Sequence, residues 1–172
     1  MNETNPYQSP ESVEEVTSPL RDEEVPSGIG GWLILPTIGV VLSPISLLVD
    51  TAHMFRLFTD GTWEACTTPG SEDYLPFWGS LLIFEMVDNL VFAAAFTFLA
   101  VLLFRKSRYF PMAYIGIALA SLGLILLDAW LVSLVVPNQR MFDHQELGGA
   151  LVGAAIWVPY MLISNRVKNT FV

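Results

Sequence analysis

Five polar residues lie inside or at the ends of long apolar stretches, where a charged side chain is costly. They are Asp50, Glu85, Asp88, Asn89 and Asp128, and we call them the acidic band. Glu85, Asp88 and Asn89 are spaced i, i+3 and i+4, so they share one face of a helix. Because a carboxylate in lipid needs a partner or water, we expect that face to point into a helix bundle or a wet cavity.

The acidic band is open to three interpretations. In the first, the carboxylates are structural and meet interfacial water or pair with nearby cations, for which the candidates are His53, Arg56, Arg140 and His144. In the second, the band is an outward-facing site in a small transporter or receptor, since carboxylate and amide oxygens suit a hard cation. In the third, the band is a helix-assembly contact with another membrane protein.

The sequence contains no recognisable catalytic arrangement. It has no metalloprotease helix motif, no Ser/His/Asp pattern and no phosphate-binding loop. Carboxylates alone do not indicate general acid–base chemistry, so we predict a non-enzymatic protein with no cofactor and no metal. Cys66 is the single cysteine, which excludes a disulfide within the chain and leaves an unpaired or intermolecular thiol.

Four apolar stretches carry the acidic band, at about residues 30–49, 81–104, 112–136 and 148–164. Each is close to the ~20 helical residues that cross the ~30 Å hydrocarbon core of a bilayer. Only 15% of the chain is charged, against about 25% in a soluble domain. Because lipid offers no partner to backbone groups, the stretches are predicted to be helices. The expected fold is all-α, a four-transmembrane-helix bundle that forms one membrane domain over residues 28–172.

Turn residues and prolines shape the predicted helices. Residues 50–75 are predicted to be a loop, because they include two Gly-containing turns and several charges. Pro36 and Pro44 in the first span and Pro159 in the fourth each remove a backbone donor, so they predict bent or locally unwound helices. Such helices either pack in a kinked bundle or line a binding site, as in some transporters.

The first 27 residues differ in composition from the rest of the chain. They contain seven acidic residues against Arg21, and they are rich in Asn, Ser and Pro. A segment of this kind buries too little apolar surface to fold, so we predict a disordered acidic cytoplasmic tail. Since it has no basic patch, the sequence argues against nucleic acid as a partner.

The distribution of Lys and Arg predicts an orientation in the cell inner (cytoplasmic) membrane. Five cations follow the second and fourth spans and two follow the first and third; they are Arg105, Lys106, Arg108, Arg166 and Lys168, against Arg56 and Arg140. The side with five cations is predicted to be cytoplasmic, which places both termini inside. The carboxylates of the acidic band then share a depth near the outer interface.

Small residues predict how the helices pack. Gly149 and Gly153 form a GxxxG pattern in the fourth span, and Gly116 and Gly123 recur in the third. Such positions let two backbones approach closely, either within the chain or in a homodimer or another membrane complex. The lipid bilayer itself is the other expected partner.

Two segments of the sequence resemble a known family. The first opens the first span, Gly28-Ile-Gly-Gly-Trp-Leu-Ile-Leu-Pro-Thr-Ile-Gly, and the second is Ser164-Asn-Arg-Val-Lys-Asn-Thr-Phe-Val172. Together they resemble the bacterial inner-membrane family called domain of unknown function 2569, which includes YdgK-like proteins. The resemblance covers about residues 28–172 and implies a four-span bundle, without implying an activity, cofactor or site residue.

The two segments also suggest a physical contact. Gly30 and Gly31 would let the entry to the first span pack against the end of the chain, where Arg166 and Lys168 follow the last helix. We therefore predict that the two ends of the membrane domain touch. The overall expectation is a multi-pass membrane protein of unknown function, non-enzymatic and accessory to another protein; the alternative is a small transporter or ion-coupled carrier with an outward-facing acidic site.

Overall fold

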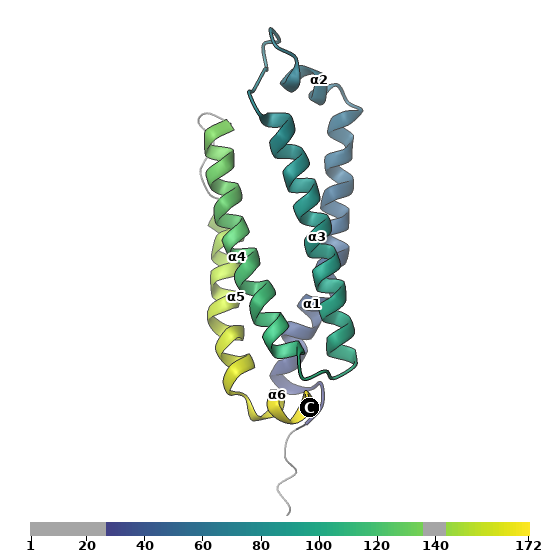
Figure 1. The fold of residues 1–172 in the computed structure, drawn as a ribbon, viewed down its shortest axis with the longest axis vertical. Helices are drawn as coiled ribbons and strands as arrows, with labels where there is room; N and C mark the ends of the chain where they lie inside the picture. Colours follow the sequence, from purple (N-terminus) through teal and green to yellow (C-terminus); the bar gives the residue numbers. More distant parts are fainter. Residues whose placement is uncertain (1–26, 136–143) are drawn as a thin grey trace, which may run out of the picture.

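The computed structural model describes residues 27–135 and 144–172, and in these ranges it contains helices and no strands (Figure 1). The elements follow one another as η1 (Gly31–Leu33), α1 (Ile34–Met54), η2 (Phe55–Phe58), α2 (Thr62–Thr67), α3 (Trp78–Phe104), α4 (Phe110–Val135), α5 (His144–Ile163) and α6 (Asn165–Thr170). The all-α prediction is confirmed for these residues. The predicted tail, residues 1–27, lies outside the described residues except for Ser27.

Three segments are long and apolar enough to cross a membrane. They are Gly31–Phe58, Trp78–Phe104 and Phe110–Val135, with mean hydropathies of 2.1, 2.1 and 2.2. The apolar part of α5, Leu147–Ile163, is shorter. Length and composition thus support three of the four predicted spans directly, and the fourth is a shorter apolar helix.

The first helix runs past its predicted end. We expected it to stop near Val49 and a loop to begin at Asp50, but α1 continues to Met54 and leads directly into η2. The Thr51 hydroxyl donates to the Leu47 carbonyl at 2.8 Å, and the Thr51 side chain is buried, so packing favours another helical turn. Asp50 therefore lies inside a helix rather than at its end.

The helices associate in two pairs. α1 packs along α3, and α4 packs along α5, while the short turn after α3 brings α4 beside it. In Figure 1 the two pairs converge toward the bottom, where α6 and the C-terminal residue lie, and they diverge toward the top. One end of the bundle is therefore closed and the other is more open.

The packed core lies at the closed end. It draws residues from η1, α1, α3, α4, α5 and α6, and its buried members are Leu33, Val40, Leu99, Leu103, Phe110, Met161, Val167 and Phe171. The rings of Phe110 and Phe171 stack with centroids 4.5 Å apart. Segments from both ends of the membrane domain thus meet in one cluster.

The prolines do not interrupt their helices. α1 continues through Pro44 and α5 continues through Pro159. Pro36 lies in the first turn of α1, where a missing backbone N–H removes no intrahelical hydrogen bond. Local unwinding, one of the two predicted effects, is therefore wrong at these positions, and bending stays a prediction.

The small residues do not make close backbone contacts within the described chain. A Cβ added at Gly116, Gly123, Gly149 or Gly153 would meet no other heavy atom within 4 Å. Close packing within the chain through these glycines, one of the two predicted roles, is thus wrong for the described residues. The reason is geometric, since each glycine faces open space rather than a neighbouring helix.

Aromatic rings fix the short α2 at the open end. Phe58 stacks on Trp63 at 4.7 Å, and Trp63 lies 6.2 Å from Trp78 at the start of α3. A Cβ at Gly79 would approach Trp63 and Thr67 to 3.0 Å, so only glycine fits beneath α2 without a shift. The segment predicted as a loop is therefore partly helical.

Candidate functional site

The acidic face of α3 continues the stripe of residues that forms the core. Glu85 is half-buried and lies one or two helical turns from Leu81 and Phe92, which are buried. Leu99 and Leu103 extend the same stripe to the closed end of the bundle. The opposite face is exposed, with Val91 58% and Phe98 58% accessible, so the structure directs Glu85 toward the other helices.

Asp88 and Asn89 lie on the same side of α3 as Glu85, and both are half-buried. The Asn89 side-chain Nδ2 donates to the sulfur of Met54, the last residue of α1, at 3.9 Å. This weak contact ties the acidic face to the end of α1. The prediction that these residues face into the bundle rather than outward agrees with this placement.

Asp128 approaches the acidic face from α4. Because α3 and α4 run antiparallel from a short turn, Asp128 stands at nearly the same level as Glu85 and Asp88. Its Oδ1 atom is buried and accepts no hydrogen bond from the described residues. Three half-buried carboxylates thus lie at one level of α3 and α4, on helices that are mostly apolar.

The fourth carboxylate of the acidic band is placed differently. Asp50 is exposed on α1, next to the buried Thr51, so it does not share the half-buried position of the other three. The cations proposed as partners are also exposed where they are described: His53 in the last turn of α1 and Arg56 in η2. Arg140 and the His144 side chain lie outside the described residues.

The chemistry available to this group is limited. In the ranges that the structure describes, no three His, Cys, Asp or Glu side chains are arranged to hold a metal ion. Neighbouring carboxylates without a nucleophile can bind a cation or accept hydrogen bonds. In an apolar setting each ionised carboxylate also needs such a partner.

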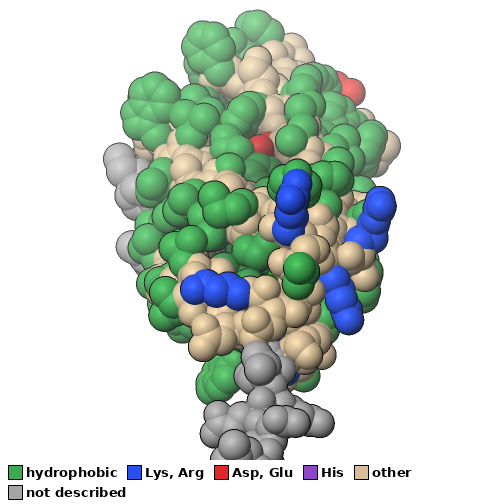
Figure 2. Space-filling model, turned by 60° about the horizontal axis from the view of Figure 1, so that its bottom comes forward, with side chains coloured by type: hydrophobic (Ala, Val, Ile, Leu, Met, Phe, Trp, Pro, Cys, Tyr) green, Lys and Arg blue, Asp and Glu red, His purple; other side chains and the backbone are tan. Residues whose placement is uncertain are grey.

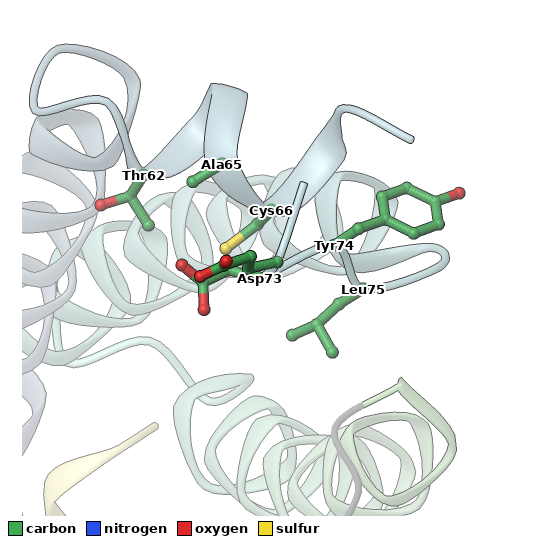
Figure 3. Close-up of a pocket in the computed structure, with 7 residues that line it drawn as sticks. Thr62, Ala65, Cys66, Asp73, Tyr74 and Leu75 are labelled. Carbon is green, nitrogen blue, oxygen red and sulfur yellow. The ribbon is translucent and has the colours of Figure 1, made fainter. Parts of the chain in front are cut away.

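A small open pocket lies in the connection before α3, away from the acidic band. It has a volume of about 490 Å³ and is lined by Thr62, Ala65, Cys66, Glu72, Asp73, Tyr74 and Leu75. Figure 3 shows Cys66 and Asp73 pointing into the hollow, whereas the ring of Tyr74 points away from them. The thiol is free and half-buried. This pocket was not predicted from the sequence, because its residues come from a segment that we expected to be a loop.

Asp60 shapes the turn that precedes this pocket. Its Oδ1 accepts a hydrogen bond from the Thr62 backbone N–H at 3.0 Å. Hydrogen bonds from the Thr62 side chain and backbone hold the pKa of Asp60 below its ordinary value. Gly61 between them has φ +88, a conformation that glycine adopts without strain. These contacts start α2 and set the wall of the pocket.

At the opposite end, the chain's two family-like segments meet. The Thr170 hydroxyl donates mainly to the Arg166 carbonyl at 2.6 Å, and its oxygen also lies 3.3 Å from the Gly28 carbonyl oxygen. A Cβ at Gly30 would lie 3.0 Å from an Arg166 guanidinium nitrogen, and at Gly31 (φ +56) it would lie 3.6 Å from that group. The prediction that the two ends touch is confirmed, and glycine is needed here for both space and conformation.

Several residues of the terminal segment have a structural role. Ser164 caps α6 by accepting from the Val167 N–H at 3.5 Å. Val167 and Phe171 enter the core, and Phe171 stacks on Phe110. Lys168 remains exposed. The pattern recognised in the sequence is therefore explained by a contact that closes the bundle.

Comparisons with known proteins found one matching family. A family model described as "Protein of unknown function (DUF2569)" matches residues 26–172. No curated protein and no solved structure matches the chain. The matched range includes both touching segments and every helix described above.

Proposed function

We propose that this chain, which belongs to the DUF2569 family, is a multi-pass protein of the cytoplasmic (inner) membrane. We propose further that it has no enzymatic activity and acts as an accessory or interaction partner of another membrane protein. The membrane assignment rests on one observation: α4 is apolar but is not covered by the rest of the chain. None of its most apolar 18-residue window is buried within the chain, although its mean hydropathy is 2.2. A helix that is apolar on all sides needs lipid or protein around it.

A fourth span is supported by the length of α5. Its apolar part, Leu147–Ile163, measures about 25 Å at 1.5 Å per residue, which is near the lower limit of about 17 residues for a helix that crosses the hydrocarbon core. With four spans, both ends of the membrane domain lie on one side. That side is proposed to be cytoplasmic, because five of the eight Lys and Arg residues adjoin the α3–α4 turn or α6.

Reporters test this topology. A reporter active only in the cytoplasm, fused in turn to the N- and C-terminal ends of the chain, should be active at both. Activity of a periplasmic reporter at the C-terminal end would contradict the proposed orientation. A reporter inserted in the connection at Pro69-Gly70 is the internal control and should give the opposite result.

The interaction role is supported by an uncovered helix surface. Gly149 and Gly153 of α5 face open space, and Gly149 is exposed. In membranes such small residues allow another helix to approach closely. The chain also offers no catalytic arrangement in its sequence, so the proposal assigns this face to lateral association with another membrane protein or with a second copy.

Site-specific photo-crosslinking tests lateral association. A photoreactive residue at Gly149 should give a crosslinked product in membranes, whereas one at Val91, on the outer face of α3, should not. Co-expression of two differently tagged copies separates self-association from association with another protein. Equal crosslinking at both positions would indicate non-specific proximity and would contradict the proposal.

The alternative function, a small transporter with an outward-facing acidic site, is favoured by the grouping of Glu85, Asp88 and Asp128. The double variant Glu85→Gln/Asp88→Asn distinguishes the two. If the variant accumulates less folded protein in the membrane but the remaining protein is unimpaired in cation flux, the acidic band has a structural role. Normal accumulation with loss of a cation flux into proteoliposomes supports the transporter.

A further inference from the structure

Four exposed cations lie together at the closed end of the bundle. They are Arg105, Lys106, Arg108 and Lys168, which we call the basic end. Figure 2 shows Lys and Arg side chains spread over this end of the molecule. The acidic residues of the described ranges lie elsewhere in the chain, between residues 50 and 88, at Asp128 and at Glu146 in the first turn of α5. Among the described residues, the basic end is therefore a surface of one sign of charge.

The turn that presents three of these cations is well defined. The Lys106 N–H donates to the Leu103 carbonyl at 3.0 Å, and the Ser107 N–H donates to the Leu102 carbonyl at 2.9 Å. Arg108 donates to the Tyr109 hydroxyl at 2.9 Å, and its guanidinium lies 5.0 Å from the centre of that ring. The turn rests on the buried Leu103 and Phe110. The positive charges are thus held on a fixed support.

Exposed aromatic side chains border the basic end. Trp32 is 71%, Phe104 64% and Tyr109 60% accessible. Trp and Tyr favour the boundary between hydrocarbon and headgroups, where their rings meet both environments. Their position beside the cations places the positive charges at the level of lipid phosphates, if the helices span the bilayer as proposed above.

We propose that the basic end binds the phosphate headgroups of anionic phospholipids. Guanidinium groups form paired, charge-assisted hydrogen bonds with phosphate oxygens, and lysine adds a point charge. Basic residues just outside a membrane span are attracted to anionic lipid. Free phosphate would satisfy the cations but not the aromatic border, so we assign the surface to lipid. This inference rests on the proposed membrane location, but not on which side of the membrane the basic end faces.

Native mass spectrometry of the purified full chain in detergent tests the proposal. Phosphatidylglycerol and phosphatidylcholine are titrated separately, and bound lipids are counted. Each Lys or Arg strengthens binding to an anionic surface by about five-fold at low salt. The triple variant Arg105→Gln/Lys106→Gln/Arg108→Gln should therefore weaken phosphatidylglycerol binding by roughly a hundred-fold, with little change for phosphatidylcholine.

The matched control retains the charge. Arg105→Lys/Lys106→Arg/Arg108→Lys should keep most of the preference for phosphatidylglycerol, and Arg56→Gln at the other end should keep all of it. Equal binding of both lipids by the wild-type chain would overturn the proposal, as would an unchanged preference in the triple neutral variant. Displacement of the lipid by millimolar inorganic phosphate would also overturn it, because the surface would then be a free-phosphate site. A reversed reporter topology with intact lipid preference would refute the orientation alone.

Discussion

The stacking of Phe171 on Phe110 predicts that a single side chain near the end of the chain controls the stability of the closed end. Phe171 is 6% exposed, and its ring centroid lies 4.5 Å from that of Phe110. Truncation of a buried phenylalanine costs about 3–5 kcal/mol in protein cores, and an aromatic pair adds about 0.5–1.5 kcal/mol beyond its buried area. Because the unfolded state in detergent keeps part of the ring away from water, we expect about 3 kcal/mol for Phe171→Ala.

The assay is unfolding of the purified chain in a mild detergent by added dodecyl sulfate, followed by far-ultraviolet circular dichroism. Val172→Ala is the matched control, because Val172 is the adjacent residue and is 90% exposed. The control should change the free energy of unfolding by less than about 0.5 kcal/mol. Phe171→Leu should fall between the two, since it keeps apolar volume but not the stacked ring. Equal stabilities of Phe171→Ala and Val172→Ala would refute the idea that the C-terminal segment closes the core.

Three further predictions concern glycines and the turn before α2. Gly31→Ala should destabilise the chain by about 1–2 kcal/mol in the same unfolding assay, because φ at Gly31 is +56. Gly39→Ala is the control: Gly39 has open space around it, so alanine should stabilise α1 by up to about 1 kcal/mol. Gly79→Ala should cost about 1–3 kcal/mol and loosen α2, because the new Cβ would lie 3.0 Å from Trp63; Gly116→Ala is the control, and equal effects of both would contradict the packing described. Carboxyl resonances of Asp60 should titrate below the ordinary value of 3.8, and Thr62→Val should raise the midpoint. Since the folded-state pKa is the lower one, the stabilisation by Asp60 is present above pH 3.8 and is lost as pH falls through the folded pKa.

The sequence predicted the helices well because long apolar runs in lipid have few alternatives to helix. It predicted the contact between the two ends from Gly30, Gly31 and Arg166, since glycines next to a long cation indicate close approach. It failed where the outcome depends on which face of a helix meets a neighbour. The glycines of α5 were expected to serve either contacts within the chain or contacts with a partner, and only their surroundings exclude the first role.

The candidate site was predictable only in part. The shared face of Glu85, Asp88 and Asn89 follows from helical spacing, and the approach of Asp128 follows from a short antiparallel turn. The separate, exposed position of Asp50 does not, because it depends on α1 continuing to Met54. The pocket around Cys66 depends on the aromatic contacts that hold α2 on α3, and no local pattern encodes contacts between such distant rings.

The composition of the core sets the order in which the bundle can be completed during synthesis. Leu33 and Val40 are made early, but their partners Met161, Val167 and Phe171 come more than a hundred residues later. Proteins generally fold from the N-terminal part first as the chain emerges, and contacts between distant residues form slowly. The core at the closed end can therefore be completed only after the last residues leave the ribosome. Premature termination within residues 164–171 would leave every long helix intact and yet remove the contacts that close this end of the bundle.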